Sequence, residues 1–183
     1  MRGEVFLLQV TPISRDDVDT YQDIRSRLDA LAGRVNGEYA DMDWQPVRYL
    51  NRTYRRDQLA GIYRAARVGL VTPLRDGMNL VAKEYVVAQE PEDPGVLVLS
   101  RFAGAAEQLK EALLVNPYDT QGMADAIQTA LRMPLSERQW RHERLMERIQ
   151  RQDVHWWRNS FLQALRDEAA PPATAPAGAV AAT

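Results

Sequence analysis

Short, continuously apolar runs alternate along most of this chain with segments of helical periodicity. Each run is rich in Val and Leu and is too short to form a helix. The runs lie at 5–10, 47–50, 68–71, 96–99 and 113–115, and the predicted helices at 14–31, 57–63, 78–89, 105–110 and from the turn at 116–119 to about 131. Strands that are apolar on both faces and separated by helices indicate a parallel sheet with helices on each side. The sequence therefore predicts an α/β protein with a doubly wound parallel sheet.

The pattern changes at Ser136, after which the chain has only helical segments. Two helix starts follow, at 136–140 and at 153–157. The final stretch is mostly Ala and Pro, without apolar periodicity, a composition typical of disorder. We therefore predict a ligand-binding α/β domain at 1–135, C-terminal helices at 136–168 and a disordered tail at 169–183.

The composition excludes several classes of function. The chain has no cysteine, which rules out thiol catalysis, disulfides and cysteine-ligated zinc. Its 23 basic and 25 acidic residues leave a net charge of −2, so neither nucleic acid nor an anionic membrane is expected as a partner. No apolar stretch reaches the roughly 18 residues of a membrane span, and the first residues lack the form of a signal peptide. We therefore expect a cytoplasmic protein.

A ligand site is expected where the strands end, because open parallel sheets bind ligands beyond the carboxyl ends of their strands. The richest loop there is 72–84, in which Asp76 and Gly77 form a strong turn signal. The N–H groups at 80–82, at the start of the next helix, are suited to a phosphate or diphosphate. Glu84 lies about one turn into that helix, where its carboxylate is placed to bind ribose hydroxyls, and Asp76 is placed to bind a sugar.

The same residues also fit a purely structural interpretation. In it, Asp76 and Gly77 are an ordinary loop, Asn79 is a helix N-cap and Glu84 is a solvated helix residue. The spacing alone leaves both interpretations open.

Arg15 follows the first predicted strand, at the same edge of the sheet. A guanidinium there can hold a phosphate through two hydrogen bonds. Of the 23 basic residues 21 are arginines, so an arginine in this sequence is by default a charge on the surface. Only its position after the first strand makes Arg15 a candidate for binding. The arginines at 141, 144, 148 and 151 alternate with glutamates, which is typical of a solvated helix face.

The remaining residues give no further catalytic motif. His142 and His155 lie far apart in the sequence and belong to neither a triad nor an HExxH motif. We therefore assign no nucleophile, general base, metal ligand or cofactor to them. Glycine-rich GxGxxG and Walker loops are absent from the sequence.

Residues 68–85, VGLVTPLRDGMNLVAKEY, closely resemble the donor-binding segment of trehalose-6-phosphate synthases. The resemblance extends to PISR at 12–15, PGVLVLS at 94–100, FAGAA at 102–106 and VNPYD at 115–119, and covers essentially residues 5–165. Those enzymes are retaining glycosyltransferases of the GT-B type, in which two Rossmann-like halves face a cleft. They transfer glucose from UDP-glucose to glucose 6-phosphate and release UDP. The resemblance implies that this chain is the C-terminal, nucleotide-binding half, with a Rossmann-like sheet.

The resemblance also implies a role for each matching residue. The residues expected to hold UDP, with backbone amides on the diphosphate and Glu84 on the ribose, are Leu80, Val81, Ala82, Lys83 and Glu84. Those expected to contact the transferred glucose are Asp76, which is the candidate catalytic residue, Gly77, Met78 and Asn79. The backbone of Tyr54 is expected to meet the uracil, and Arg15 the phosphate of glucose 6-phosphate. In this family the departing phosphate helps to deprotonate the acceptor, so neither a metal, a cofactor nor an enzyme nucleophile is expected.

Parts of the family's cleft have no counterpart in this sequence. An arginine and a lysine that neutralise the donor diphosphate in relatives precede the point that matches Met1, and most acceptor contacts come from the N-terminal half. We therefore expect little or no transferase activity from this polypeptide alone. For a full-length protein, the resemblance implies a homo-oligomer (a dimer or tetramer). If the N-terminal half is missing, Trp156, Trp157 and Phe161 are expected to be partly exposed.

Three alternatives stay open. The chain could be a non-catalytic fragment that binds nucleotide sugar, or a subunit that needs a separate N-terminal half. It could also belong to a transferase of the same family with another acceptor, such as glycerol 3-phosphate.

Overall fold

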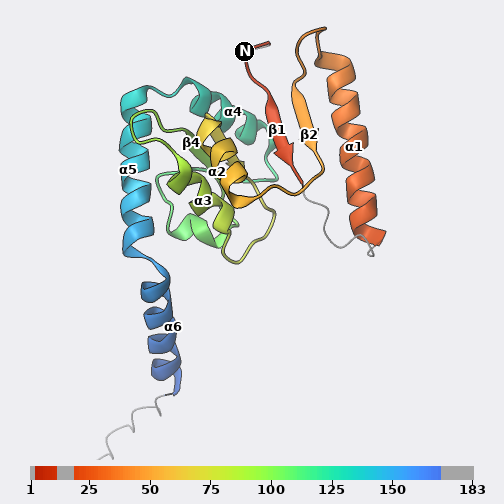
Figure 1. Cartoon of the computed structure of the whole chain (residues 1–183). Coiled ribbons are helices and arrows are strands. Elements are labelled where there is room, and N and C mark those ends of the chain that lie inside the picture. The colour runs from red at the N-terminus through yellow and green to blue at the C-terminus, as the bar shows by residue number, and fades with distance from the viewer. Residues whose placement is uncertain (1–2, 12–18, 170–183) are drawn as a thin grey trace, which may run out of the picture. The chain divides into compact units, whose positions relative to one another are not determined.

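The computed structural model describes residues 3–11 and 19–169 (Figure 1). Strands alternate with helices up to the last strand, and only helices follow it. The elements are β1 (Leu7–Val10), α1 (Asp19–Tyr39), β2 (Val47–Leu50), α2 (Arg56–Ala65), β3 (Val68–Val71), α3 (Leu80–Ala88), β4 (Val96–Ser100), the 3₁₀ helix η1 (Gly104–Glu107), β5 (Leu113–Val115), α4 (Thr120–Arg132), α5 (Leu135–Arg151) and α6 (Val154–Ala169). The chain divides into two compact units, Met1–Leu59 and Ala60–Thr183.

The first unit contains a βαβ arrangement. β1 and β2 pair in parallel, with Leu7 opposite Val47 and Val10 opposite Leu50. The connecting helix α1 is fixed to β2 by the side-chain amide of Asn36. This amide donates to the carbonyl of Val47 at 2.9 Å and accepts from the N–H of Val47 at 3.0 Å. A parallel pair joined through a helix is what the alternation of apolar runs predicts.

The second unit contains a three-stranded parallel sheet with β4 in the centre. All residues of β4 are buried, as expected for a strand covered on both faces. Leu97 and Leu99 belong to a core that they share with residues of α3 and α5, whereas Val96 and Val98 belong to a core shared with α4. Helices therefore cover both faces of this sheet, as the doubly wound pattern predicts.

Helix α3 packs closely on this sheet because two glycines leave room for Tyr85. A Cβ atom on Gly69, in β3, would lie 2.7 Å from the Tyr85 ring, and a Cβ atom on Gly95 would overlap the phenol oxygen. The side chain is 2% exposed, and its hydroxyl donates to the carbonyl of Ala66 at 3.0 Å. Burial raises the pKa of Tyr85, so the phenol stays neutral. This contact fixes α3, and with it the loop that leads into the helix.

The structure confirms the predicted α/β class with parallel strands. It differs in one respect: the described strands lie in a two-stranded sheet, β1–β2, and a three-stranded sheet, β3–β4–β5, where the sequence predicts one. The reason is that an apolar run predicts a strand but does not specify its neighbour. The domain boundaries at 135 and 168 remain predictions, and the predicted tail lies, from residue 170 on, outside the described residues.

Candidate functional site

At the carboxyl ends of the strands, backbone hydrogen bonds join the loop after β4 to the loop after β3 and to the last residue of β5. Asp76, after β3, forms a parallel bridge with Ala103, after β4. The N–H of Arg101, also after β4, donates to the carbonyl of Val115 at the end of β5, at 2.9 Å. Since parallel sheets bind ligands at this edge, the structure places the predicted loop 72–79 where a ligand site is expected.

The carboxylate of Asp76 organises the turn in which it lies. Its Oδ1 accepts from the N–H of Met78 at 3.1 Å, and its Oδ2 accepts from the side-chain amide of Asn79 at 2.9 Å. Asp76 is half-buried, whereas Gly77 and Met78 are exposed. The structure thus brings together, in one ordered turn, the four residues expected to contact glucose.

Asn79 ends this turn and caps α3. Its φ of 66° and ψ of 88° lie in the left-handed region, and no other non-glycine residue that the structure describes has a positive φ. Its side-chain oxygen accepts from the N–H of Ala82 at 2.9 Å. α3 therefore begins at Leu80, two residues after the predicted start at Met78, because a left-handed residue cannot continue a helix.

The first turn of α3 has the form of an anion site. The N–H groups of Leu80 and Val81 have no acceptor within the helix, because they belong to its first turn. Both residues are exposed, by 57% and 43% respectively. Unpaired N–H groups and the positive end of the helix dipole favour a phosphate at this position.

Lys83 and Glu84 differ in burial although they are neighbours. Lys83 is half-buried, and burial lowers the pKa of its ammonium group. Glu84 is exposed, and its charge adds to the effect of burial in raising the pKa of the Tyr63 phenol. An exposed carboxylate one turn into α3 has the access to hydroxyl groups that its predicted role requires.

Two predicted residues belong to the first unit. Tyr54, which follows β2, is half-buried, and the guanidinium of Arg52 lies 4.5 Å from the centre of its ring. Arg15 falls in the segment 12–18, outside the described residues, so its predicted role stays a prediction.

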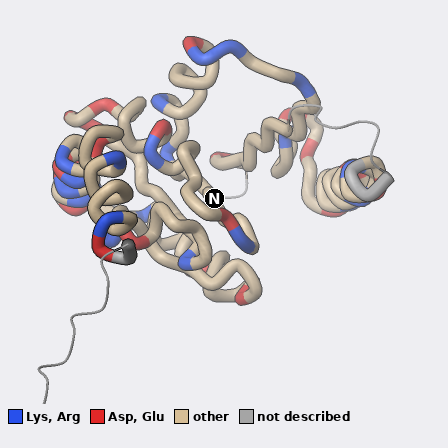
Figure 2. The backbone as a smooth tube through the Cα atoms, turned by 90° about the horizontal axis from the view of Figure 1, so that it is seen from below, with Lys and Arg blue, Asp and Glu red and all other residues tan. Residues whose placement is uncertain are grey.

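His142 and three of the arginines of α5 that the sequence pattern singles out have structural partners. His142 is buried, with Nε2 3.1 Å from the carbonyl of Val86, so this nitrogen carries the proton. The arginines that alternate with glutamates form ion pairs at 2.7–3.1 Å: Arg141–Glu137, Arg144–Glu147 and Arg148–Glu111. Figure 2 shows basic and acidic residues interspersed along the chain. Arg144 and Arg151 are exposed, as the predicted solvated face requires, whereas Arg141 and Arg148 are half-buried and donate to Glu111, which precedes β5.

The described residues contain neither a cluster suited to a metal ion nor a helix suited to span a membrane. In the ranges 3–11 and 19–169, no group of three or more histidine, aspartate or glutamate side chains is arranged to hold a metal ion. Within the same ranges, no helix combines the length and the apolar character needed to cross a bilayer.

The sequence did not reveal which residues hold the turn at 76–79. In the sequence, this role of 102–105 has no marker beyond the family resemblance of 102–106. In the structure this segment makes the hydrogen bonds that fix this turn, including one from the N–H of Ala105 to the carbonyl of Met78 at 2.8 Å. The only signal in the sequence is Gly104, whose role depends on a close approach between two loops.

A parallel sheet covered on both faces, with an ordered polar turn and an exposed helix start at its carboxyl edge, defines a ligand-binding protein of the Rossmann type. The family is given by comparison with known proteins. The chain belongs to glycosyltransferase family 20, whose model matches residues 1–167.

The similar proteins are trehalose-6-phosphate synthases. The enzyme of Enterobacter sp. (strain 638) is 54% identical over 164 residues, which are 90% of this chain and 35% of that protein. A Burkholderia xenovorans enzyme solved in complex with glucose-6-phosphate has a TM-score of 0.86 and 55% identity, over 90% of this chain and 36% of that one. A structure from E. coli, bound with UDP-2-fluoro glucose, has a TM-score of 0.86 and 52% identity, over 90% and 37%. The chain thus spans about a third of the length of the curated relatives that it matches.

Proposed function

We propose that this chain supplies the UDP-glucose-binding half of a retaining glucosyltransferase, which forms trehalose 6-phosphate and UDP from UDP-glucose and glucose 6-phosphate. The observation that carries the proposal is the ordered turn at Asp76–Asn79, directly followed by the exposed start of α3 at the carboxyl edge of β3. Identity above 50% to trehalose-6-phosphate synthases, over nine-tenths of the chain, supports this choice of donor.

The proposed contacts follow the chemistry of the residues. The backbone amides of Leu80 and Val81 bind the diphosphate, and Glu84 accepts hydrogen bonds from the ribose hydroxyls. The turn at 76–79 binds the glucose. Tyr54 meets the uracil through its backbone. Arg15 binds the phosphate of the acceptor.

In the proposed reaction, a hydroxyl oxygen of glucose 6-phosphate forms a bond to the anomeric carbon of the donor. The bond from that carbon to the UDP oxygen breaks on the same face, so the configuration is retained. The hydroxyl proton passes to the departing phosphate, which leaves with UDP. In this reaction no side chain of the chain has to act as a nucleophile.

We expect the isolated chain to have little or no transferase activity. The start of a helix stabilises an anion by only about 0.3–2 kcal/mol, which is modest for the charge of a diphosphate. UDP release from UDP-glucose and glucose 6-phosphate measures this directly. Turnover close to that of a full-length relative would contradict the expectation.

Binding of the donor is tested by titration calorimetry of the chain with UDP-glucose. The unchanged chain is expected to give heat, and Glu84→Ala to remove most of it, because the ribose loses its acceptor. Glu143→Ala is the matched control, since it makes the same change of charge at an exposed position in α5. If the unchanged chain gives no heat at millimolar ligand, the proposed binding is wrong.

A second candidate function is that of a subunit that acts together with a separate N-terminal half. The exposed apolar side chains of α6 favour it. Trp157 and Phe161 stack on each other with ring centres 5.4 Å apart, and both are about half exposed, at 49% and 51%. Apolar area of this kind marks an interaction surface. If this function is right, adding the separately expressed N-terminal half of a relative will restore UDP release, and if it is wrong, the mixture will stay as inactive as the chain alone.

A further inference from the structure

We propose that Gly104 is a positioning residue, which sets the geometry of the glucose-binding turn without touching the sugar. This inference rests on the proposed function of that turn. Gly104 belongs to the segment 102–105, which we call the clamp.

The clamp holds the turn through three backbone hydrogen bonds. At one end of the turn, the N–H of Asp76 donates to the carbonyl of Phe102 at 3.3 Å, and the N–H of Gly104 donates to the carbonyl of Asp76 at 3.0 Å. At the other end, the N–H of Ala105 donates to the carbonyl of Met78 at 2.8 Å. The peptide groups of the turn are thus fixed from outside the loop, in addition to the bonds that Asp76 makes within it.

The approach of the two loops is possible only because residue 104 has no side chain. A Cβ atom there would overlap the carbonyl oxygen of Gly77 and lie 2.9 Å from its carbonyl carbon. The obstacle is backbone, which cannot rotate away as the end of a side chain can. Gly104 does not have a positive φ, so the requirement is one of space and not of backbone angle.

The clamp acts on one end of the proposed donor site only. The amides proposed to bind the diphosphate lie in the first turn of α3, which is held by the Asn79 cap and by the packing of Tyr85 on the sheet. None of the three clamp bonds involves residues 80–84. A change at Gly104 is therefore expected to weaken recognition of the glucose and to leave recognition of UDP nearly unchanged.

The test is calorimetry of the full chain and of Gly104→Ala with UDP and with UDP-glucose. Displacing the turn should weaken contacts to the sugar hydroxyls. We expect the Kd for UDP-glucose to rise about tenfold, which corresponds to the binding free energy of one good hydrogen bond. The Kd for UDP should change less than about twofold. Gly61→Ala, in α2, is the matched control: it is the same substitution at a glycine whose Cβ atom would have open space around it, so both Kd values should stay unchanged.

A second variant changes Phe102, the residue of the clamp whose side chain is partly exposed to solvent. Phe102 is 43% exposed and packs on Tyr118 with ring centres 6.0 Å apart, so Phe102→Ala is expected to fold and to shift the ratio in the same direction by about threefold. If Gly104→Ala does not fold, the ratio of the two Kd values in Phe102→Ala decides whether the clamp positions the turn. The positioning role is wrong if the variants that fold bind both ligands as the unchanged chain does, or lose both equally. If the unchanged chain binds UDP-glucose no better than a protein without this site, the proposed function itself is wrong.

Discussion

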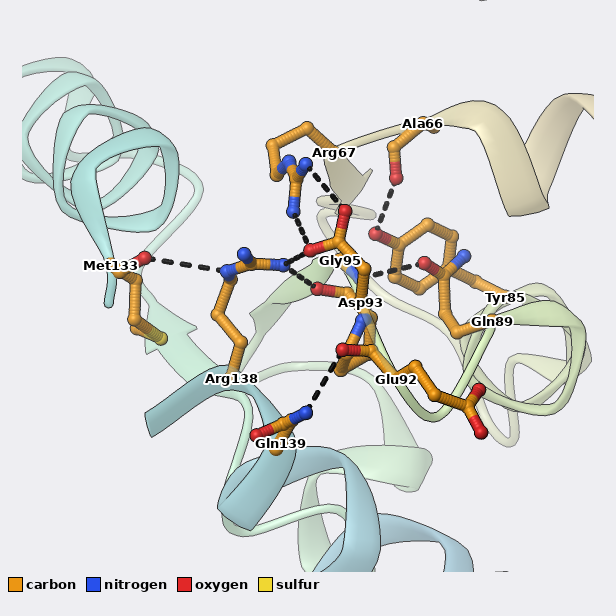
Figure 3. Close-up of polar contacts among 11 residues, drawn as sticks. Ala66, Arg67, Tyr85, Gln89, Glu92, Asp93, Gly95, Met133, Arg138 and Gln139 are labelled. Carbon is orange, nitrogen blue, oxygen red and sulfur yellow. Dashed lines mark hydrogen bonds and ion pairs between the residues drawn. The ribbon is translucent and has the colours of Figure 1, made fainter. Parts of the chain in front are cut away.

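At the scale of single residues, the guanidinium of Arg138 is at the centre of a cluster of polar groups in the second unit (Figure 3). It is 8% exposed, pairs with Asp93 at 2.7 Å, and donates to the carbonyls of Pro94 and, at 3.3 Å, Met133. Asp93 also receives two hydrogen bonds from Arg67, at 2.9 and 3.1 Å. The guanidinium of Arg67, and then that of Arg138, hold the pKa of Asp93 far below its ordinary value. The cluster joins the loop before β4 to α5.

Asp93→Asn should therefore destabilise the chain at neutral pH and not in acid. The pKa of Asp93 is lower in the folded chain than in the unfolded one. Its contribution to the free energy of unfolding is therefore complete above about pH 5, and it is lost as the pH falls through the lowered pKa. We expect the difference in melting temperature between the variant and the unchanged chain to be largest at pH 7 and to shrink below about pH 4. Thermal melts at a series of pH values measure it. A difference that does not vary with pH would show that the ionised carboxylate is not responsible.

At the scale of elements, α3 carries the residues 80–84 of the candidate site and is fixed at both ends. Its start is held by the Asn79 cap, and its end by Gln89, whose side-chain oxygen accepts from the N–H of Gly95 at 2.8 Å. Between them, the packing of Tyr85 prevents the helix from moving along the sheet. The exposed first turn of α3 is therefore a rigid site, and its amides are oriented before a ligand binds.

Two substitutions of Asn79 separate its two roles in this element. Asn79→Ala loses the cap and puts alanine, which tolerates a left-handed φ less well than asparagine, at this position, and we expect it to lower the free energy of unfolding by about 2 kcal/mol. Asn79→Gly loses the cap but accepts the φ of 66°, and we expect a loss of less than about 1 kcal/mol. Urea denaturation followed by circular dichroism gives both values. Equal losses would mean that the left-handed backbone contributes no strain.

At the scale of the whole molecule, the last described helix differs from the others of the second unit. Every residue of α6 from Val154 to Asp167 is exposed, whereas α5 buries Leu145 and His142 against the rest of the unit. The side chains of Trp156 and Trp157 are therefore partly exposed, as expected. Because α6 buries so little within this chain, it adds little to the stability of the unit that precedes it.

Ending the chain after Arg151 should consequently leave that unit as stable as before. We expect the free energy of unfolding to change by no more than about 0.5 kcal/mol. Binding of a dye for apolar surfaces should fall, because the exposed aromatic side chains are gone. Leu145→Ala, at a position 4% exposed in α5, is the contrasting variant and should cost about 2–5 kcal/mol. A truncated chain that unfolds as easily as this variant would show that α6 packs on the unit in solution.

Some features of the site depend on local chemistry and were predictable from the sequence. The turn at Asp76-Gly77 and the N-cap at Asn79 are examples, because both are formed by hydrogen bonds between residues at most three positions apart. The start of α3 was predicted two residues early, because helical periodicity does not reveal a left-handed backbone. Arg138 was not singled out at all, since among 21 arginines nothing in the sequence marks the buried one.

The sequence by itself determined the α/β class, the order of strands and helices and the position of the turn at 76–79. These features depend on the pattern of apolar and polar residues along the chain, which can be read directly from the sequence. Only the tertiary structure decided that Tyr85 fills the space left by Gly69 and Gly95, and that Gly104 lies against Gly77. Such contacts join residues that the chain keeps 10 to 27 positions apart, as Gly95 from Tyr85 and Gly104 from Gly77. Their energy depends on distances of a few tenths of an ångström, which residue types alone do not specify.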